Sequence, residues 1–223
     1  MNPPQTIFNA SETEILSGDF HPLIERIGSA EGSALVEMVN ASLLIECARD
    51  FAGLKRFLES YRGQLLVPVE LPLICQAFAH ASRNEFSELI TLDQQQAHDT
   101  RLKIFSSASK RIGKMQLKRL RPLRDQRGLQ RYLRAVDDGD ANAWHTMIYG
   151  VTLASFSMPL RQGLVNYSAR VLSGFVQSSG GFEKFPQPDC DALIEENLSR
   201  ILPEIDHALI KASLNPKIQI PQA

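Results

Sequence analysis

The sequence has little of what marks a secreted, disulfide-bonded or membrane protein. Its 223 residues include three cysteines, Cys47, Cys75 and Cys190, and an odd number at wide spacing does not indicate a disulfide framework. The first residues show no basic segment followed by an apolar run, and no stretch approaches about 18 apolar residues. These absences predict a cytoplasmic protein whose cysteines stay reduced.

The charge balance and the histidine spacing argue against several kinds of site. A net charge of −1 is unlike the strongly basic surface of a general nucleic-acid binder. There is no Cys-x-x-Cys motif, and no two histidines lie three or four residues apart, so neither a metal ion nor a cofactor is expected. A site shared across a dimer axis stays open. The histidines are His21, His80, His98, His145 and His207.

Patterns typical of enzymes are also missing. The pair Gly113-Lys114 lacks the upstream glycine and the following Ser or Thr of a phosphate-binding loop, and it falls inside a predicted helix. The chain has no Gly-x-Ser-x-Gly turn for a nucleophile, and it lacks the repeated Glu-x-x-His pairs that a di-iron bundle needs. We therefore expect no catalytic residues.

What the sequence does contain is a series of amphipathic helices. Apolar residues recur at spacings of three and four, between clusters of proline, glycine and polar residues. No pair of alternating runs is joined by a hairpin signal. The pattern predicts an all-α protein with a single helical bundle of about eight to ten helices over residues 21–214. A flexible tail is expected at residues 1–20 and an extended tail at 215–223.

The expected helix ends follow from capping and breaking residues. Asp50, Asp99 and Asp189 are predicted N-caps. The Val67-Pro68 step is predicted to end a helix, because the residue before a proline avoids the α region. A break is expected at residues 137–140, and a loop at residues 182–188. The helices are predicted over residues 32–48, 54–65, 71–79, 82–97, 99–120, 128–136, 141–156, 160–176 and 190–213.

One segment is unusually basic. Ten lysines and arginines fall within residues 110–134, where Asp125 is the only acid. A solvated helix face explains this pattern, and so does a docking surface for an acidic partner. Nucleic acid fits less well, because the segment has almost no aromatic residues for base stacking. The residues chosen as the predicted partner-binding patch are Lys114, Arg119, Arg121 and Arg124.

Two apolar runs admit two interpretations. Residues 151–156 and 171–176 mix small and large apolar side chains, which lets helices approach closely. Packing inside one chain accounts for them. A dimer face would have the same apolar character.

Four stretches, taken in order, resemble the urease accessory protein F family. They are Phe57-Leu58 with Gly63 and Glu70-Leu-Pro-Leu73, then Ala108-Ser109-x3-Gly113-Lys114, then Ala143-Trp-His-Thr-Met-Ile-Tyr-Gly-Val151, then Met158-Pro-Leu160 with Tyr167. Their order and spacing agree with the family over residues 50–205. The chain departs from the family at residues 27–33, at Gly180-Gly181 and at residues 215–219, where the usual partner-contacting motifs are absent.

The resemblance implies an all-α homodimer that catalyses no reaction. Such a protein joins the accessory protein called D or H and the GTPase accessory protein G, and the complex delivers nickel to the urease apoprotein. Its role would be to bridge the two and to gate the GTPase without holding nickel. Two alternatives remain at this point. One is a helical enzyme with a haem or flavin near His145 or His80. The other is a regulatory module that binds a small molecule between residues 141 and 176.

Overall fold

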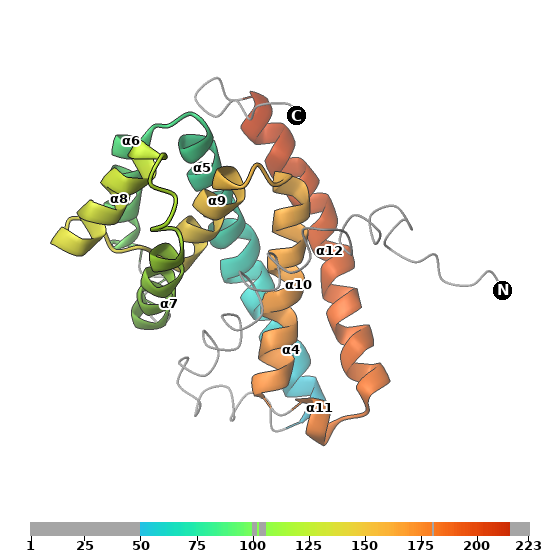
Figure 1. Cartoon of the computed structure of the whole chain (residues 1–223). Helices are drawn as coiled ribbons and strands as arrows, with labels where there is room; N and C mark the ends of the chain where they lie inside the picture. The colour runs from blue at the N-terminus through green and yellow to red at the C-terminus, as the bar shows by residue number, and fades with distance from the viewer. Residues whose placement is uncertain (1–49, 100–101, 103–105, 180, 215–223) are drawn as a thin grey trace.

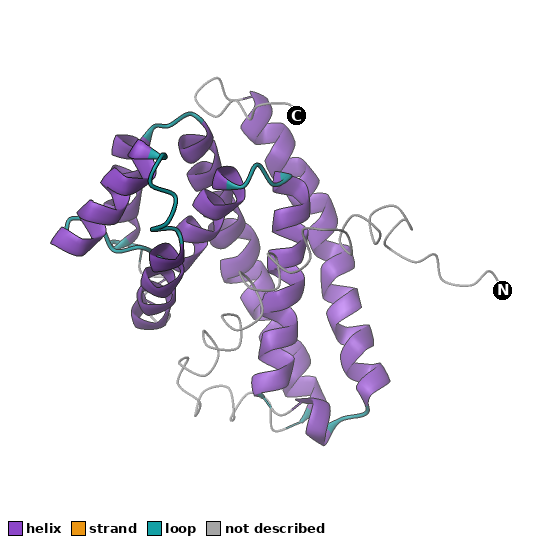
Figure 2. Ribbon diagram, viewed as in Figure 1, coloured by secondary structure: helices purple, strands orange, loops and turns teal. Residues whose placement is uncertain are grey.

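A computed structural model describes residues 50–99, 102, 106–179 and 181–214 (Figure 1). Every regular element among these residues is a helix, and none is a strand (Figure 2). The all-α prediction is confirmed. The predicted helix at 32–48 and both predicted tails lie outside the described residues. The elements are α4 (Phe51–Tyr61), η1 (Arg62–Glu70), α5 (Leu71–Ser82), α6 (Phe86–Gln96), α7 (Ser106–Arg119), α8 (Arg127–Asp138), α9 (His145–Ser155), α10 (Leu160–Ser178), α11 (Gly181–Lys184) and α12 (Gln187–Leu214).

The first three elements form one continuous helix from Phe51 to Ser82, called the long helix below. Asp50 begins it as predicted, since its Oδ1 accepts a hydrogen bond from the Gly53 amide at 2.6 Å. The prediction that Val67-Pro68 ends the helix is wrong. The chain there widens into the π-helix η1, with Pro68 inside it.

Packing explains why the helix continues past Pro68. A proline ring in an α-helix clashes with the carbonyl four residues earlier, and the wider π turn relieves that clash. Leu66, Val69 and Glu70 on either side of the proline are all buried. Burial of this face therefore outweighs the local preference of the Val67-Pro68 step for an extended chain.

The continuous long helix also lowers the helix count. With it counted once and the single-turn α11 left aside, the described part of the chain has seven helices. Against this part of the chain the predicted count of eight to ten is slightly off, because the expected break at Pro68 does not occur.

Three other predicted boundaries differ in the structure. The helix expected from residue 82 begins at Phe86, after a turn in which Asn84 has φ 58°. The helix expected from residue 99 is described from Ser106 onward, and residues 100–101 and 103–105 before it lie outside the described residues. The predicted loop at 182–188 contains part of α11, and α12 begins at Gln187, which places Asp189 in its first turn. The break after α8 is confirmed, with Gly139 at φ 89° as the left-handed cap.

The helix predicted from residue 141 begins only at His145. Residues 141–144 are not helical, with Ala143 at φ 59°, and the buried Asp93 of α6 binds them. Asp93 Oδ1 accepts from the Asn142 amide at 2.5 Å, and Oδ2 accepts from the Ala143 amide at 2.9 Å. A tertiary contact from a distant helix thus holds the chain out of the helical conformation.

The described helices enclose two apolar cores, which meet along α5 and α9, the most extensive helix pair (Figure 1). The first core lies between the long helix, α10 and α12. The second lies between α5, α6, α7, α8 and α9. Val151 and Leu153 of one apolar run and Val171, Leu172, Phe175 and Val176 of the other are buried in these cores. Packing within the chain therefore accounts for both runs.

The long helix is long and apolar enough to cross a membrane by length and composition alone. More than half of its most apolar window is buried against other helices, which is also how a core helix of a soluble protein is placed. This feature is weak evidence for a membrane span.

Candidate functional site

The inner face of α7 contacts the start of α9 and the residues just before it. Gly113 lies so close to the non-helical segment 141–144 that a Cβ atom there would stand 1.9 Å from the Ala143 carbonyl oxygen. The His145 amide donates to Ser109 Oγ at 3.1 Å, which satisfies one of the free N–H groups at the beginning of α9. Gly113-Lys114 is inside a helix, as expected, and serves close packing between helices.

The segment before α9 is fixed on a second side by Asp93. Besides the two amides, its carboxylate accepts from the Tyr132 hydroxyl at 2.6 Å, and its backbone carbonyl accepts from Trp144 Nε1 at 3.1 Å. On the outer side, Lys110 Nζ lies 4.7 Å from the centre of the Trp144 ring. Residues 141–144 are thus held between α6, α7 and α8.

A second buried carboxylate, Glu70, joins the long helix to α10. Its Oε2 accepts hydrogen bonds from Tyr61 at 2.5 Å and from Tyr167 at 3.1 Å. Burial raises the pKa of Glu70 to about 7, although both hydroxyl bonds favour the charged form. Glu70 therefore titrates near neutral pH in the middle of the first core.

The two histidines considered as cofactor ligands have other partners. His145 is buried, with Nδ1 3.0 Å from Gln116 Oε1 and its ring beside those of Tyr149 and Tyr167. Burial lowers the pKa of His145 to about 4, so it is neutral at physiological pH. His80 is half-buried and binds Glu85 at 2.9 Å. Among the described residues, no group of three His, Cys, Asp or Glu side chains could hold a metal ion.

The outer face of the same region is the basic segment predicted from the sequence. We call the exposed cations of α7, α8 and the turn between them the basic surface. They are Arg111, Lys114, Lys118, Arg119, Arg121, Arg124, Arg127, Arg131 and Arg134. Met115, also on α7, is 45% exposed, which is unusual for a large apolar side chain in this molecule. The inner face of α7 is meanwhile buried in the second core through Ile112 and Leu117.

A small notch of about 200 Å³ lies between α7 and α8 on this surface. One side of it is lined by Lys114 and Lys118 of α7 and by Arg121, which lies in the turn just after α7. Arg121 Nη2 reaches across to Asp137 of α8 at 2.6 Å, and both side chains are about half exposed. The apolar residues of the notch are Leu117, Leu133 and Val136.

The structure brings together only part of the predicted patch. Lys114 and Arg121 share the notch, and Lys118 joins them there although it was not among the four residues chosen. Arg119 and Arg124 are exposed but do not line the notch. The helical spacing of Lys114, Lys118 and Arg121 could have identified this group from the sequence.

Sequence reasoning missed the two buried carboxylates as structural centres. The apolar pattern places Asp93 and Glu70 next to apolar residues and so suggests that they are buried. It does not reveal which residues would form hydrogen bonds with them. Their partners are 39 to 97 residues away, apart from Tyr61. Only the contacts of the folded chain pair them.

The four stretches that resemble the accessory protein F family make contact in the structure. Glu70 of the first binds Tyr167 of the last at 3.1 Å. Ser109 and Gly113 of the second pack against Ala143 and His145 of the third. No curated protein gives a significant match to the chain. The family model for UreF, the urease accessory protein F family, matches residues 48–179, more than half of the chain, and these are the residues that build both contacts. The protein therefore belongs to the UreF family.

Proposed function

We propose that this protein is a non-catalytic scaffold that bridges the accessory protein D or H and the GTPase accessory protein G during nickel delivery to urease. Membership in the UreF family is the observation that carries the proposal, because the family serves urease maturation and interacts with other accessory proteins. In this role nickel is the cargo of the complex, and the protein acts from the cytoplasm as a homodimer.

The architecture supports a scaffold. Glu70 and Asp93 are bonded to neighbouring helices, and His145 is bonded to Gln116, so the buried polar groups of the two cores hold helices together. Hydrogen bonds between buried groups make the packing of a fold more rigid and specific. A rigid helical body suits a protein whose work is to present surfaces to two partners at fixed positions.

The basic surface is the proposed docking site for one of these partners. The side chains of its cations are exposed to solvent, where a partner can reach them. Charge of one sign on an exposed surface raises the encounter rate with an acidic partner and disfavours partners of like charge. Lys114 and Arg121 at the notch, with Arg119 and Arg124 beside them, are the proposed contact residues.

Charge reversal tests this docking site. We expect Lys114→Glu with Lys118→Glu to weaken capture of purified accessory protein D/H or G by the tagged protein, most strongly at low salt. Arg56→Glu on α4, an exposed arginine outside the basic surface, is the matched control. Equal capture of both partners by the double variant and by the wild type would rule out the basic surface as a docking site.

A further inference from the structure

The notch between α7 and α8 already binds one carboxylate, which belongs to the chain itself. Arg121 Nη2 donates to both oxygens of Asp137, at 2.9 and 2.6 Å. Guanidinium and carboxylate groups recognise each other through charge-assisted bonds of this kind. The contact therefore shows which chemical group the Arg121 end of the notch can bind.

The other two cations of the notch have no such partner. Lys114 and Lys118 are exposed, and neither side chain forms an ion pair or a hydrogen bond with a described residue. They lie four residues apart on one face of α7, where like charges repel and destabilise a helix. The last turn of a helix favours cations, which accounts for Lys118 but not for Lys114. An anion between the two lysines would relieve this repulsion.

The charge around the notch stays positive when the nearby acids are counted. Residues 106–140 contain ten lysines and arginines but only four aspartates. The notch itself has three cations, and Asp137 is the one acid that lines it. Asp137 therefore occupies Arg121 without neutralising the notch, and a second carboxylate is still attracted there.

The bond between Arg121 and Asp137 can be exchanged at little cost. Both side chains are about half exposed, and an exposed ion pair contributes little to stability because water and salt screen it. Asp137 bonds to one cation of the notch. A carboxylate that enters between the lysines would meet all three cations, so its gain exceeds what the chain loses.

We propose that the notch receives an aspartate or glutamate side chain of the acidic partner, which binds between Lys114 and Lys118 and takes Arg121 from Asp137. This inference rests on the proposed docking function of the basic surface and names the group that is recognised there. Asp137 acts as an internal competitor, because it keeps Arg121 paired in the free protein and weakens the binding of other carboxylates.

Amide chemical shifts of the full-length protein test the proposal. The probe is the blocked peptide Glu-Glu-Glu, in which adjacent carboxylates raise the affinity, and the matched control is Gln-Gln-Gln. Salt at about 0.15 M limits the effect of charges more than about 8 Å away. With the glutamate peptide we expect saturable shifts at Lys114, Lys118 and Arg121 that exceed those at Arg131, which lies outside the notch. The glutamine peptide should cause much smaller shifts.

Removal of the internal competitor should strengthen binding. We expect Asp137→Asn to bind the glutamate peptide about threefold more tightly than the wild type, because Arg121 is released and a repelling charge is removed. Damage to the fold would lower the affinity, so a gain cannot come from a merely structural role. Asp138→Asn changes the net charge equally at an exposed position outside the notch and should bind nearly as the wild type does.

The outcomes separate this inference from the docking function. Asp137→Asn that binds the peptide no more tightly than Asp138→Asn would overturn the inference, as would equal shifts with the glutamate and glutamine peptides. If Lys114→Glu with Lys118→Glu still loses capture of the accessory proteins in that case, the docking function stands without it. Loss of partner capture in the charge-reversed variant, together with tighter peptide binding by Asp137→Asn, supports both.

Discussion

The two cores of this protein each contain a buried carboxylate, and the two are treated differently. Asp93 accepts hydrogen bonds from two backbone amides and the Tyr132 hydroxyl, using both of its oxygens. Glu70 accepts its two bonds on one oxygen, from Tyr61 and Tyr167. Burial raises the pKa of Glu70 to about 7. Asp93 holds the non-helical backbone before α9 in place, while Glu70 joins helices through side chains and titrates near neutral pH.

The difference shows how a buried charge acquires a role in the fold. Backbone amides cannot move without unfolding the segment that carries them, so Asp93 determines where α9 begins. Tyrosine hydroxyls are at the ends of side chains, so the bonds to Glu70 can adapt when its proton is gained or lost. Neither carboxylate has a positively charged partner among the contacts above.

Removal of Asp93 should have the largest effect. In Asp93→Ala the buried Ala143 amide and the Tyr132 hydroxyl lose their acceptor, as does the half-buried Asn142 amide. We expect a loss of about 4 kcal/mol in the free energy of unfolding, because buried polar groups left without partners are costly. Urea denaturation measures it. If the free energy of unfolding falls by less than it does for an ordinary surface substitution, Asp93 does not hold residues 141–144 in place.

Glu70→Gln should change the pH dependence of stability. The folded pKa of about 7 lies above the ordinary value of 4.5, so the folded state binds the proton more tightly than the unfolded state. The stabilisation that comes from this proton is fully present below pH 4.5, and it is lost as the pH rises through about 7. We expect the wild type to lose up to about 3 kcal/mol over this range relative to the glutamine variant.

Denaturation of both proteins at each pH measures this effect. The comparison cancels the titration of His145, which is present in both. Glu204→Gln, an exposed acid of α12, is the control and should leave the pH profile as it is in the wild type. A parallel pH dependence in wild type and Glu70→Gln would show that Glu70 does not titrate in the core.

The smallest effect is expected at the surface pair of Arg121 and Asp137. Both side chains are about half exposed, so Asp137→Asn should cost only about 0.5 kcal/mol. High salt should erase the difference, since it screens exposed charges. A loss as large as that of Asp93→Ala would mean that the notch is part of the structural core and is not a surface available to a partner.

Helix type and most helix positions were predictable because apolar periodicity reports burial directly. The basic surface was predictable for the same reason, since charged residues at helical spacing stay outside. The course of the chain at Pro68 and at residues 141–144 was not predictable. At both places a tertiary contact outweighs the local preference, through the buried residues around Pro68 in one case and through Asp93 in the other.

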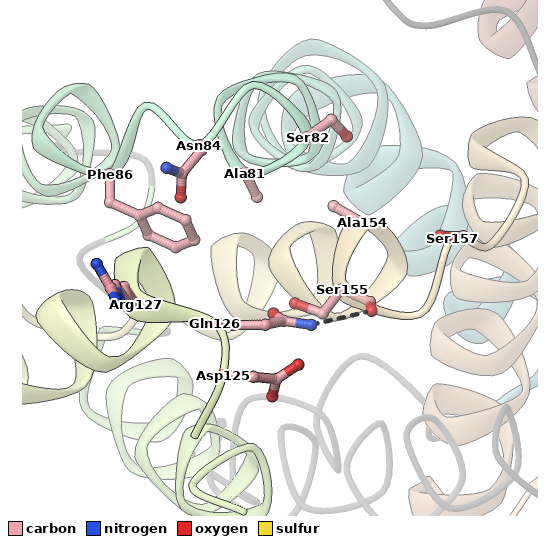
Figure 3. A pocket seen from close by; sticks show the side chains of 10 residues that line it. All are labelled: Ala81, Ser82, Asn84, Phe86, Asp125, Gln126, Arg127, Ala154, Ser155 and Ser157. Carbon is pink, nitrogen blue, oxygen red and sulfur yellow. Dashed lines mark hydrogen bonds between the residues drawn. The ribbon is translucent and has the colours of Figure 1, made fainter. Parts of the chain in front are cut away.

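The resemblance to the family was visible in four short stretches, but its physical basis was not. Sequence order showed that the stretches belong together, whereas only the structure shows that they touch. A cleft of about 510 Å³ between α5, α8 and α9 was also hidden, because its lining comes from helix ends and turns that are far apart in the sequence (Figure 3). No periodic pattern marks such a place.

The bridging role is tested most directly by mixing purified accessory protein D/H and GTPase accessory protein G with and without this protein. Size-exclusion chromatography with light scattering reports which proteins elute together and with what mass. We predict that the two accessory proteins co-elute only when this protein is present, in a complex that contains all three. Binding of this protein to one partner that excludes the other would contradict the bridging role.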